Sequence, residues 1–345
     1  MPIGVALSGG GAAALAHAGV LAELTAAGIP IQCVAGTSAG AVVGAAYAAG
    51  CLAAFRKTMC GLSRRRVLWL SDPTWPHAGL LEGRRALELI RPYIGERIED
   101  LPHPFAAVAT DLQSGAEVVL RHGSVLEAVR ASVAIPGLFT PQRWQGRWLV
   151  DGGLVNPLPV DVARQLGAQF VIAVSVLGIP ATAYLPRQER RGLALELLAR
   201  LQARMTAGRA PPKPSGPPPL LPPLPSDEPG LIDVLTRASA VVQAHIAAHR
   251  LREHPPDYLL RVSLPEVGLF DFHRSAEAVA AGHAAARAAL PEIQATLDAC
   301  PPLRVRIARW LDGVRARRHG APPPSVGGRS ATVGPKRGPK DVPAP

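Results

Sequence analysis

The sequence predicts an α/β fold built on a mostly parallel sheet. Short apolar runs alternate with helical segments along the N-terminal quarter, and glycines or prolines separate most of them. The chain has 345 residues, of which 48% are hydrophobic, so it can bury the core of one large domain or of two smaller ones. Only 4% of the residues are aromatic. We therefore expect helices that pack closely on the sheet through small side chains.

Two strand–helix units open the chain. Residues 3–8 are expected to form a short apolar strand, and a run of glycines separates it from a helix expected at 13–27. A second strand is expected at 31–35 and a second helix at 39–49. This alternation is typical of a parallel sheet, because a helix must carry the chain back to the end of the sheet at which each parallel strand begins.

The remaining elements follow at wider spacing. We expect further strands at 105–110, 117–120, 147–150, 170–176 and 258–262, and helices at 125–132, 159–166, 231–252 and 276–297. Residues 31–55 contain no charged side chain, which is long enough for a membrane-spanning helix. Four glycines interrupt this stretch, so a strand, a tight turn and a buried helix are favoured instead.

The chain is expected to divide into four regions. Residues 1–180 and 231–298 are interpreted as the two parts of one α/β core. Residues 181–230 are interpreted as an insertion, with an amphipathic helix and a linker in which ten prolines fall between Pro211 and Pro229. The helix suits either a mobile cover that touches lipid or an ordinary surface helix beside a disordered loop. Residues 299–345 are expected to be a disordered, basic tail rich in proline and glycine.

The formal net charge of +11 is concentrated near the C-terminus. Residues 301–345 carry ten Lys and Arg against two acidic residues, and so supply eight of the eleven net positive charges. Because no aromatic residues are interleaved among the basic ones, we expect a solvated tail and no nucleic-acid partner. The four cysteines lack disulfide or metal spacing, and the N-terminus does not resemble a signal peptide. A cytoplasmic location is expected, with peripheral contact at the inner membrane face through basic segments as a further option.

One segment predicts a serine nucleophile. The residues Gly36-Thr37-Ser38-Ala39-Gly40 form a G-x-S-x-G motif placed after an apolar strand and before a helix. A nucleophile elbow requires this context, because a sharp strand-to-helix turn forces strained backbone angles on the serine while the elbow glycines Gly36 and Gly40 avoid clashes. Ser38 would then project above the sheet edge, beside the positive end of the helix dipole.

A second glycine-rich segment follows the first strand. Gly9, Gly10 and Gly11 can present backbone N–H groups without side chains in the way, which suits an oxyanion hole or a phosphate cradle. The same segment also fits a dinucleotide-binding fingerprint that ends at Ala14. A nucleotide fold needs an acidic residue after the second strand, where this chain has the serine motif. A nucleotide-dependent enzyme is therefore only a remote alternative.

A serine nucleophile needs a base, and Asp151 is the candidate. It follows an apolar segment and precedes two glycines, although a plain Asp-Gly turn would have the same sequence. Among the histidines, His17 is interpreted as a core or helix-packing residue. His245 and His249 are four residues apart on an expected helix but lack the glutamate of a zinc protease motif. No metal and no cofactor are assigned.

Together these segments resemble the patatin-like phospholipase family, in its bacterial branch related to the catalytic domain of neuropathy target esterase. The motifs in family order are the glycine loop at 9–14, Leu15-Ala16-His17-Ala18-Gly19-Val20-Leu21, the elbow, Arg130-Ala131-Ser132 with Ile135-Pro136-Gly137-Leu138-Phe139, Asp151-Gly152-Gly153, and Asn156-Pro157-Leu158-Pro159. The resemblance covers roughly residues 3–180 and, more loosely, 231–298.

The resemblance implies a three-layer α/β/α sandwich that hydrolyses phospholipid or lysophospholipid esters. It implies a Ser38–Asp151 dyad without a catalytic histidine, an acyl-enzyme on Ser38, and an oxyanion hole formed by the glycine loop. The family usually has Arg or Lys followed by Gly after the triple glycine, where this chain has Ala13 and Ala14. A catalytically weak lipid- or membrane-binding protein is therefore the alternative function.

Overall fold

The computed structural model describes residues 1–72, 79–178, 231–264 and 266–299. All of the elements described below belong to one compact unit, Met1–Cys300, and the second unit is Pro301–Pro345. The insertion expected at 181–230 lies outside the described residues, and so does all of the expected tail beyond residue 299.

The described chain alternates strands and helices, as the sequence predicts. The strands are β1 (Ile3–Leu7), β2 (Ile31–Thr37), β3 (Phe105–Asp111), β4 (Glu117–Leu120), β5 (Gln142–Trp144), β6 (Arg147–Asp151), β7 (Phe170–Ser175) and β8 (Tyr258–Arg261). The α-helices are α1 (Ala16–Ala26), α2 (Ala39–Ala48), α3 (Leu52–Cys60), α4 (Arg64–Leu70), α5 (Arg84–Ile94), α6 (Val125–Ser132), α7 (Val160–Gln165), α9 (Leu231–Glu253) and α10 (Ser275–Asp298). Short 3-10 helices are η1 (Gly11–Leu15), η2 (Ile98–Asp100), η3 (Gly152–Leu154) and η4 (Phe272–Arg274).

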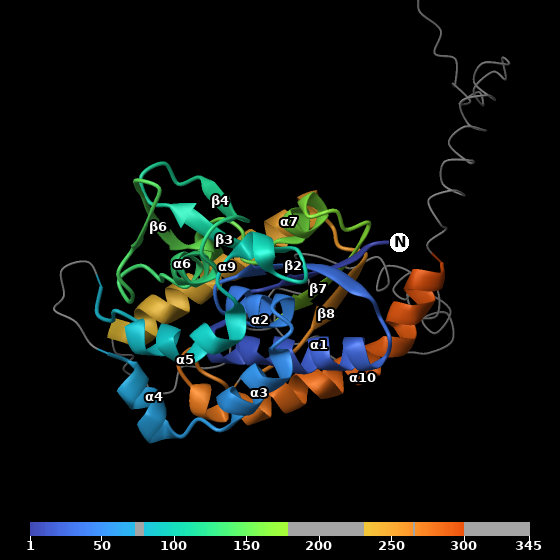
Figure 1. The fold of residues 1–345 in the computed structure, drawn as a ribbon, viewed down its shortest axis with the longest axis horizontal. Helices are drawn as coiled ribbons and strands as arrows, with labels where there is room; N and C mark the ends of the chain where they lie inside the picture. Colours follow the sequence, from blue (N-terminus) through green and yellow to red (C-terminus); the bar gives the residue numbers. More distant parts are fainter. Residues whose placement is uncertain (73–78, 179–230, 265, 300–345) are drawn as a thin grey trace, which may run out of the picture. The chain divides into compact units, whose positions relative to one another are not determined.

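The strands form one eight-stranded sheet in the order β5-β6-β3-β2-β1-β7-β8, with β4 also paired to β3. The five strands from β3 to β8 in this order are parallel to one another, whereas β4, β5 and β6 pair antiparallel at one side. Helices cover both faces of the sheet (Figure 1). The predicted fold class, an α/β/α sandwich with a mostly parallel sheet, is confirmed.

Strand β3 brings the ends of β2 and β6 together. Strand β4 pairs with residues 107–110 of β3, so it occupies one edge along that length. Strand β2 pairs with 105–108 and β6 with 109–111, so both must lie along the opposite edge. Because β2 is parallel to β3 and β6 is antiparallel, their C-terminal ends meet head to head. Thr37 lies opposite Val108, and Asp151 lies opposite Ala109.

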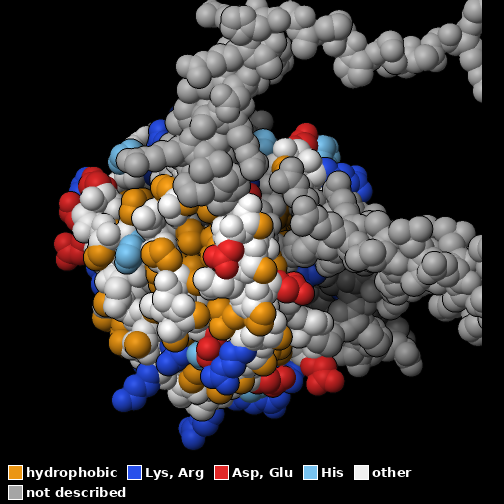
Figure 2. Space-filling view, turned by 90° about the vertical axis from the view of Figure 1, so that its right-hand side faces the viewer, with side chains coloured by type: hydrophobic (Ala, Val, Ile, Leu, Met, Phe, Trp, Pro, Cys, Tyr) orange, Lys and Arg blue, Asp and Glu red, His pale blue; other side chains and the backbone are white. Residues whose placement is uncertain are grey.

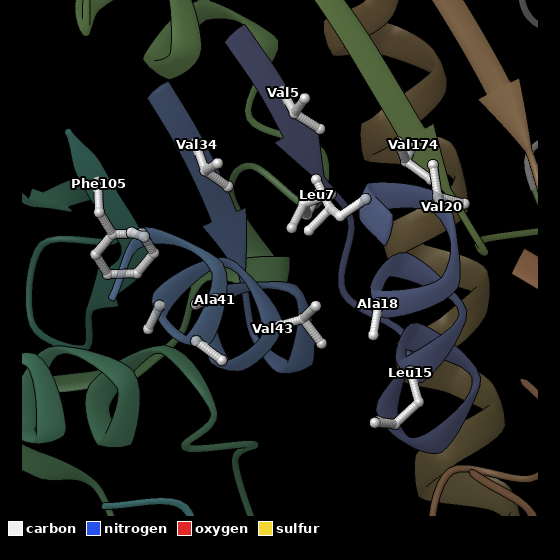
Figure 3. Close-up of a cluster of buried hydrophobic side chains, with 14 of the residues drawn as sticks. Val5, Leu7, Leu15, Ala18, Val20, Val34, Ala41, Val43, Phe105 and Val174 are labelled. Carbon is white, nitrogen blue, oxygen red and sulfur yellow. The ribbon is translucent and has the colours of Figure 1, made fainter. Parts of the chain in front are cut away.

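The core lies on both faces of the sheet, because alternate side chains of each strand point to opposite sides. On one face, strand residues such as Leu7 and Val34 pack against Ala18 of α1 and Val43 of α2 (Figure 3). On the other face, smaller strand residues pack against α7 and α9; they include Ala6, Ala35, Ala106 and Ala173. The expectation of close packing through small side chains agrees with this arrangement.

Two features differ from the sequence expectations. The helix expected at 13–27 begins as η1 and becomes α-helical only at Ala16, because the glycine loop turns sharply before it. Helices α3, α4 and α5 and strand β5 were not anticipated. Residues 31–55 form β2, α2 and the start of α3, which agrees with the strand, turn and helix expected there. No helix among the described residues is long and apolar enough to cross a membrane.

Helices α1 and α10 approach each other unusually closely. A Cβ atom placed on Gly282 of α10 would lie 2.0 Å from the backbone oxygen of Ala16, and one placed on Gly19 of α1 would lie 2.2 Å from that of Val279. Neither neighbour is a flexible side chain that could move away. These two glycines therefore allow the backbones to pack at a distance that no other residue permits.

We predict that Gly282→Ala lowers the free energy of unfolding by at least about 2 kcal/mol, although alanine favours helix by about 1 kcal/mol. Urea denaturation measures this change. Gly61→Ala is the matched control, because Gly61 has φ −86° and an added Cβ would meet nothing closer than 3.5 Å. Equal stability of the two variants would contradict the close approach of α1 and α10.

Candidate active site

Ser38 occupies the strained turn between β2 and α2. Its φ of 55° and ψ of −129° are rare for a residue with a side chain, and the side chain is buried, with 7% of its area exposed. A Cβ on Gly36 would lie 2.5 Å from the Gly40 oxygen, and one on Gly40 would lie 2.4 Å from the Ser8 oxygen. The turn therefore needs both glycines, as expected of a nucleophile elbow.

Side chains from neighbouring segments hold this turn in place. The backbone N–H of Ser38 donates to the hydroxyl of Ser132 at 2.8 Å, and that hydroxyl donates to the oxygen of Val108 at 2.6 Å. The hydroxyl of Thr37 donates to the oxygen of Asn156 at 2.7 Å. Strained backbone persists only where the surroundings fix it, and these bonds do so from α6, β3 and the segment after β6.

Asp151 lies at the end of β6, where the sheet brings it next to the elbow. Its side chain is 2% exposed, and its Oδ1 accepts a hydrogen bond from the N–H of Gly153 at 2.7 Å. The hydroxyl of Thr110 donates to the Asp151 backbone oxygen at 2.8 Å. Oδ2 makes no hydrogen bond of standard geometry to any described residue. One carboxylate oxygen is thus fixed, and the other is available.

Burial raises the pKa of the Asp151 carboxyl from 3.8 to about 6. The nearby Ser38 hydroxyl and the Gly153 N–H oppose this rise, because both favour the ionised form. The hydroxyl is therefore close enough to act on the carboxylate, although the two do not form a hydrogen bond of standard geometry. A carboxylate that is ionised at neutral pH, yet has a higher proton affinity than usual, suits the role of a general base.

The glycine loop after β1 presents free backbone donors. Gly10 and Gly11 have φ values of 137° and 56°, and their N–H groups bond to no described residue. A Cβ on Gly10 would lie 2.4 Å from Val176, and one on Gly11 would lie 2.5 Å from Leu269, so a side chain at either position would clash. By contrast, the N–H of Gly9 already donates to the Pro157 oxygen at 3.1 Å. Of the three glycines, Gly10 and Gly11 are the ones that can donate to a bound oxyanion.

His17 anchors the start of this loop. Its Nε2 lies 2.9 Å from the backbone oxygen of Ser8, and because a carbonyl only accepts, Nε2 must carry the proton. Burial lowers the pKa of His17 to about 4, so the ring is neutral at physiological pH. The residue packs the helix and the loop, as the sequence interpretation proposed. His245 and His249 are exposed, and the described residues contain no group of three or more potential ligands that could hold a metal ion.

An apolar pocket adjoins Ser38. Its walls come from α2, α3, α4, α5 and the segment before η4, and they include Val42, Phe55, Leu70, Leu87 and Leu269. The charged residue in the lining is Arg130, which is buried and donates through Nη2 to the backbone oxygen and hydroxyl of Thr140 at 2.8 Å. Such walls suit a hydrocarbon chain.

Sequence reasoning missed several residues that build the site. Ser132 and Asn156 lie within motifs that the resemblance includes, so their positions, but not their hydrogen bonds, could be found. Gln243 of α9 gave no such signal. Its amide oxygen lies 2.8 Å from a Cβ placed on Gly153 and 3.4 Å from one placed on Gly9. A lone glutamine on a long helix looks like a surface residue until the fold brings it to the site.

Comparison with known proteins identifies the family of the chain. The profile of the patatin-like phospholipase family matches residues 5–164, which include Ser38 and Asp151. An uncharacterized NTE family protein of Mycobacterium tuberculosis is 36% identical over 328 residues, covering 84% of this chain and 91% of that protein. A second such protein from the same species is 42% identical, covering 46% of this chain and 28% of that one.

A mammalian relative extends the similarity. Patatin-like phospholipase domain-containing protein 6 of Mus musculus is 36% identical over 181 residues, covering 50% of this chain but only 13% of its own length. The similarity to the first mycobacterial protein covers more than four fifths of each chain. The chain therefore belongs to the patatin-like phospholipase family, in the branch of the NTE family proteins.

Proposed function

We propose that this protein is a serine hydrolase that cleaves acyl ester bonds of phospholipid or lysophospholipid. The observation that carries the proposal is the meeting of β2 and β6, which sets a strained serine beside a buried carboxylate at the edge of an apolar pocket. Membership of the patatin-like phospholipase family supports lipid hydrolysis as the general activity. Ser38 is the proposed nucleophile, Asp151 the base, and the N–H groups of Gly10 and Gly11 the oxyanion donors.

In the first step, the Ser38 oxygen attacks the ester carbonyl carbon, and its proton passes to Asp151 Oδ2. The carbonyl oxygen becomes an oxyanion, which the N–H groups of Gly10 and Gly11 stabilise by about 3 kcal/mol each. When the tetrahedral intermediate collapses, the bond to the alcohol breaks, and the alcohol takes the proton from Asp151. The acyl group remains on Ser38 as an ester.

In the second step, water replaces the alcohol. Asp151 removes a proton from the water as the water oxygen attacks the acyl carbon, and the same glycine donors stabilise the second oxyanion. Collapse releases the fatty acid, and the proton on Asp151 returns to the Ser38 oxygen. The cycle needs one titrating side chain, because the same carboxyl accepts and returns the proton in both steps.

The departure at Ala13 bears on how strongly this site works. Ala13 lies buried in η1, two residues after Gly11, at the position where the family usually has a cation. It supplies no positive charge to the loop or to a substrate head group. A catalytically weak lipid-binding protein is the second candidate function, and this single substitution is the observation that favours it.

We predict that purified wild-type protein releases fatty acid from lysophosphatidylcholine or diacyl phosphatidylcholine and that Ser38→Ala lowers kcat at least about 1000-fold. Ser114→Ala is the matched control, because Ser114 is exposed in the turn between β3 and β4. Equal activity of Ser38→Ala and wild type would refute the nucleophile. No release by the wild type from either lipid would favour the binding function instead.

We predict that Asp151→Asn abolishes hydrolysis yet stabilises the fold above pH about 6. In the wild type, the folded pKa of about 6 exceeds the ordinary 3.8, so the folded state binds the proton more tightly than the unfolded state. Stability is therefore lost as pH rises from about 4 through about 6, by a total of about 3 kcal/mol. Urea denaturation of both proteins across this range tests it, since the neutral amide escapes this loss. Parallel curves for the two proteins would contradict the raised pKa.

The rate should show the same titration. We predict that kcat/KM on a soluble ester rises with pH as Asp151 ionises, with a midpoint near the folded pKa of about 6. A profile that is flat between about pH 5 and 7, or one that falls as pH rises, would mean that another group acts as the base.

A further inference from the structure

Helices α4 and α5 form a cap with two different sides. Toward the interior, Val67 and Leu70 of α4 and Leu87 of α5 line the same apolar pocket as Ser38. In Figure 1 the two helices lie on the left side of the molecule, with α4 at its lower edge and α5 above it. Their outer side therefore faces away from the pocket that their inner side encloses.

The outer side of this cap is unusually apolar. Leu68 is 73% exposed and Trp69 is 49% exposed, and both belong to α4. Leu80, which precedes α5, is 38% exposed. Scattered exposed hydrophobic residues need no explanation, but two adjacent large ones on a seven-residue helix form a contiguous surface.

The same surface is strongly basic. Its exposed arginines are Arg64, Arg65, Arg66, Arg84 and Arg85. The guanidinium groups of Arg66 and Arg85 stack over the Trp69 ring, at 4.5 Å and 4.8 Å from its centroid. The nearby acids are already engaged: Glu82 pairs with Arg84, and Asp72 accepts from backbone N–H groups at the start of α5. A net positive field therefore surrounds an apolar centre.

This pattern is local. On the face that Figure 2 presents, acidic and basic side chains are interspersed among hydrophobic ones. That face is the right-hand side of Figure 1, away from α4. The basic and apolar character of the cap is therefore not shared by that face.

We propose that the outer surface of α4 and α5 docks onto an anionic phospholipid bilayer. Leu68 and Trp69 would enter the boundary between head groups and acyl chains, where tryptophan is favoured, while the arginines bind lipid phosphates. The proposal rests on the proposed function, because docking there would set the bilayer about one helix diameter, or ~10 Å, from the pocket beside Ser38.

A protein partner is less well matched to this surface. Protein interfaces are enriched in tryptophan and arginine too, but a guanidinium group there needs an acceptor at a fixed position, whereas five exposed arginines here surround two exposed apolar side chains. Phosphate groups in a head-group layer satisfy guanidinium donors without a fixed geometry, and the layer adapts to a small convex helix. Charge complementarity and the lipid-facing pocket beneath both favour the bilayer.

Vesicle sedimentation tests the proposal. Ser38→Ala serves as the background, so that no lipid is consumed, and the vesicles contain phosphatidylcholine alone or with roughly 30% phosphatidylglycerol. We expect binding to the anionic vesicles that weakens between about 0.1 and 0.5 M salt. Adding Leu68→Ser with Trp69→Ser should weaken it at least about 10-fold, and Arg65→Gln with Arg66→Gln should remove most of the preference for anionic lipid.

A matched control separates this surface from any exposed tryptophan. Trp148 of β6 is 53% exposed, and Arg143 lies 5.8 Å from its ring centroid, so it copies the chemistry of Trp69 at another place in the fold. Trp148→Ser should bind vesicles like its parent. Equal loss in the Trp148 and the Leu68–Trp69 variants, or no loss in the latter, would overturn the proposal, as would failure of the parent to bind anionic vesicles.

Activity in the Ser38-containing protein distinguishes the two proposals. The Leu68–Trp69 variant should hydrolyse a dispersed short-chain ester within about 2-fold of wild type while losing activity on anionic vesicles by about 10-fold or more. If the wild type hydrolyses no ester at all, the proposed function fails, whereas vesicle binding still decides the docking surface. Equal loss on both substrates would mean that the cap shapes the pocket only, and would overturn the docking proposal.

Discussion

The site depends on one constraint, which is that β2 and β6 share an edge of β3 and end against each other. If all strands were parallel, their C-terminal ends would lie along one end of the sheet, and the residues that follow them would be separated by at least the distance between neighbouring strands. Because β6 runs in the opposite direction, its last residue, Asp151, lies next to the end of β2 and therefore next to the elbow. Ser38 and Asp151 are more than a hundred residues apart in the sequence. The pairing of β2 and β6 with β3 nevertheless brings their backbones close together.

The structure stabilises the site with groups that do not react. Ser132 fixes the backbone of Ser38, Thr110 fixes that of Asp151, and His17 fixes the loop that precedes the free glycine donors. Each contributes an ordinary hydrogen bond, yet together they offset a strained turn and a buried charge. Arg250 extends the support: it bonds both Glu117 and Asp161, and those acids accept from the Asn156 amide. The backbone positions of Ser38 and Asp151 are thus held by hydrogen bonds from several separate segments.

Much of this could be predicted from the sequence, because local signals were strong where the backbone is constrained. Gly36 and Gly40 predict the elbow, because a side chain at either position would clash with the backbone of the turn. Apolar runs in the sequence predict the strands. Helices α3 and α4 were missed because they are short, with nine and seven residues, and give little periodic signal, whereas α5 has apolar residues at helical spacing that the expectations did not use. The role of Gln243 was missed for a different reason. Its position depends on how α9 packs against the sheet, and no short sequence motif predicts that packing.

The close contact of Gly19 with α10 has a consequence for the synthesis of the protein. Helix α1 is synthesised before α10, the helix that covers it, whose Gly282 is translated some 260 residues after Gly19. At typical rates of about 5–20 residues per second, the apolar side of α1 waits roughly 13–50 s for its partner. During that interval the apolar side chains of α1 that pack against α10 in the folded protein lack this partner, so the core cannot close on that face of the sheet.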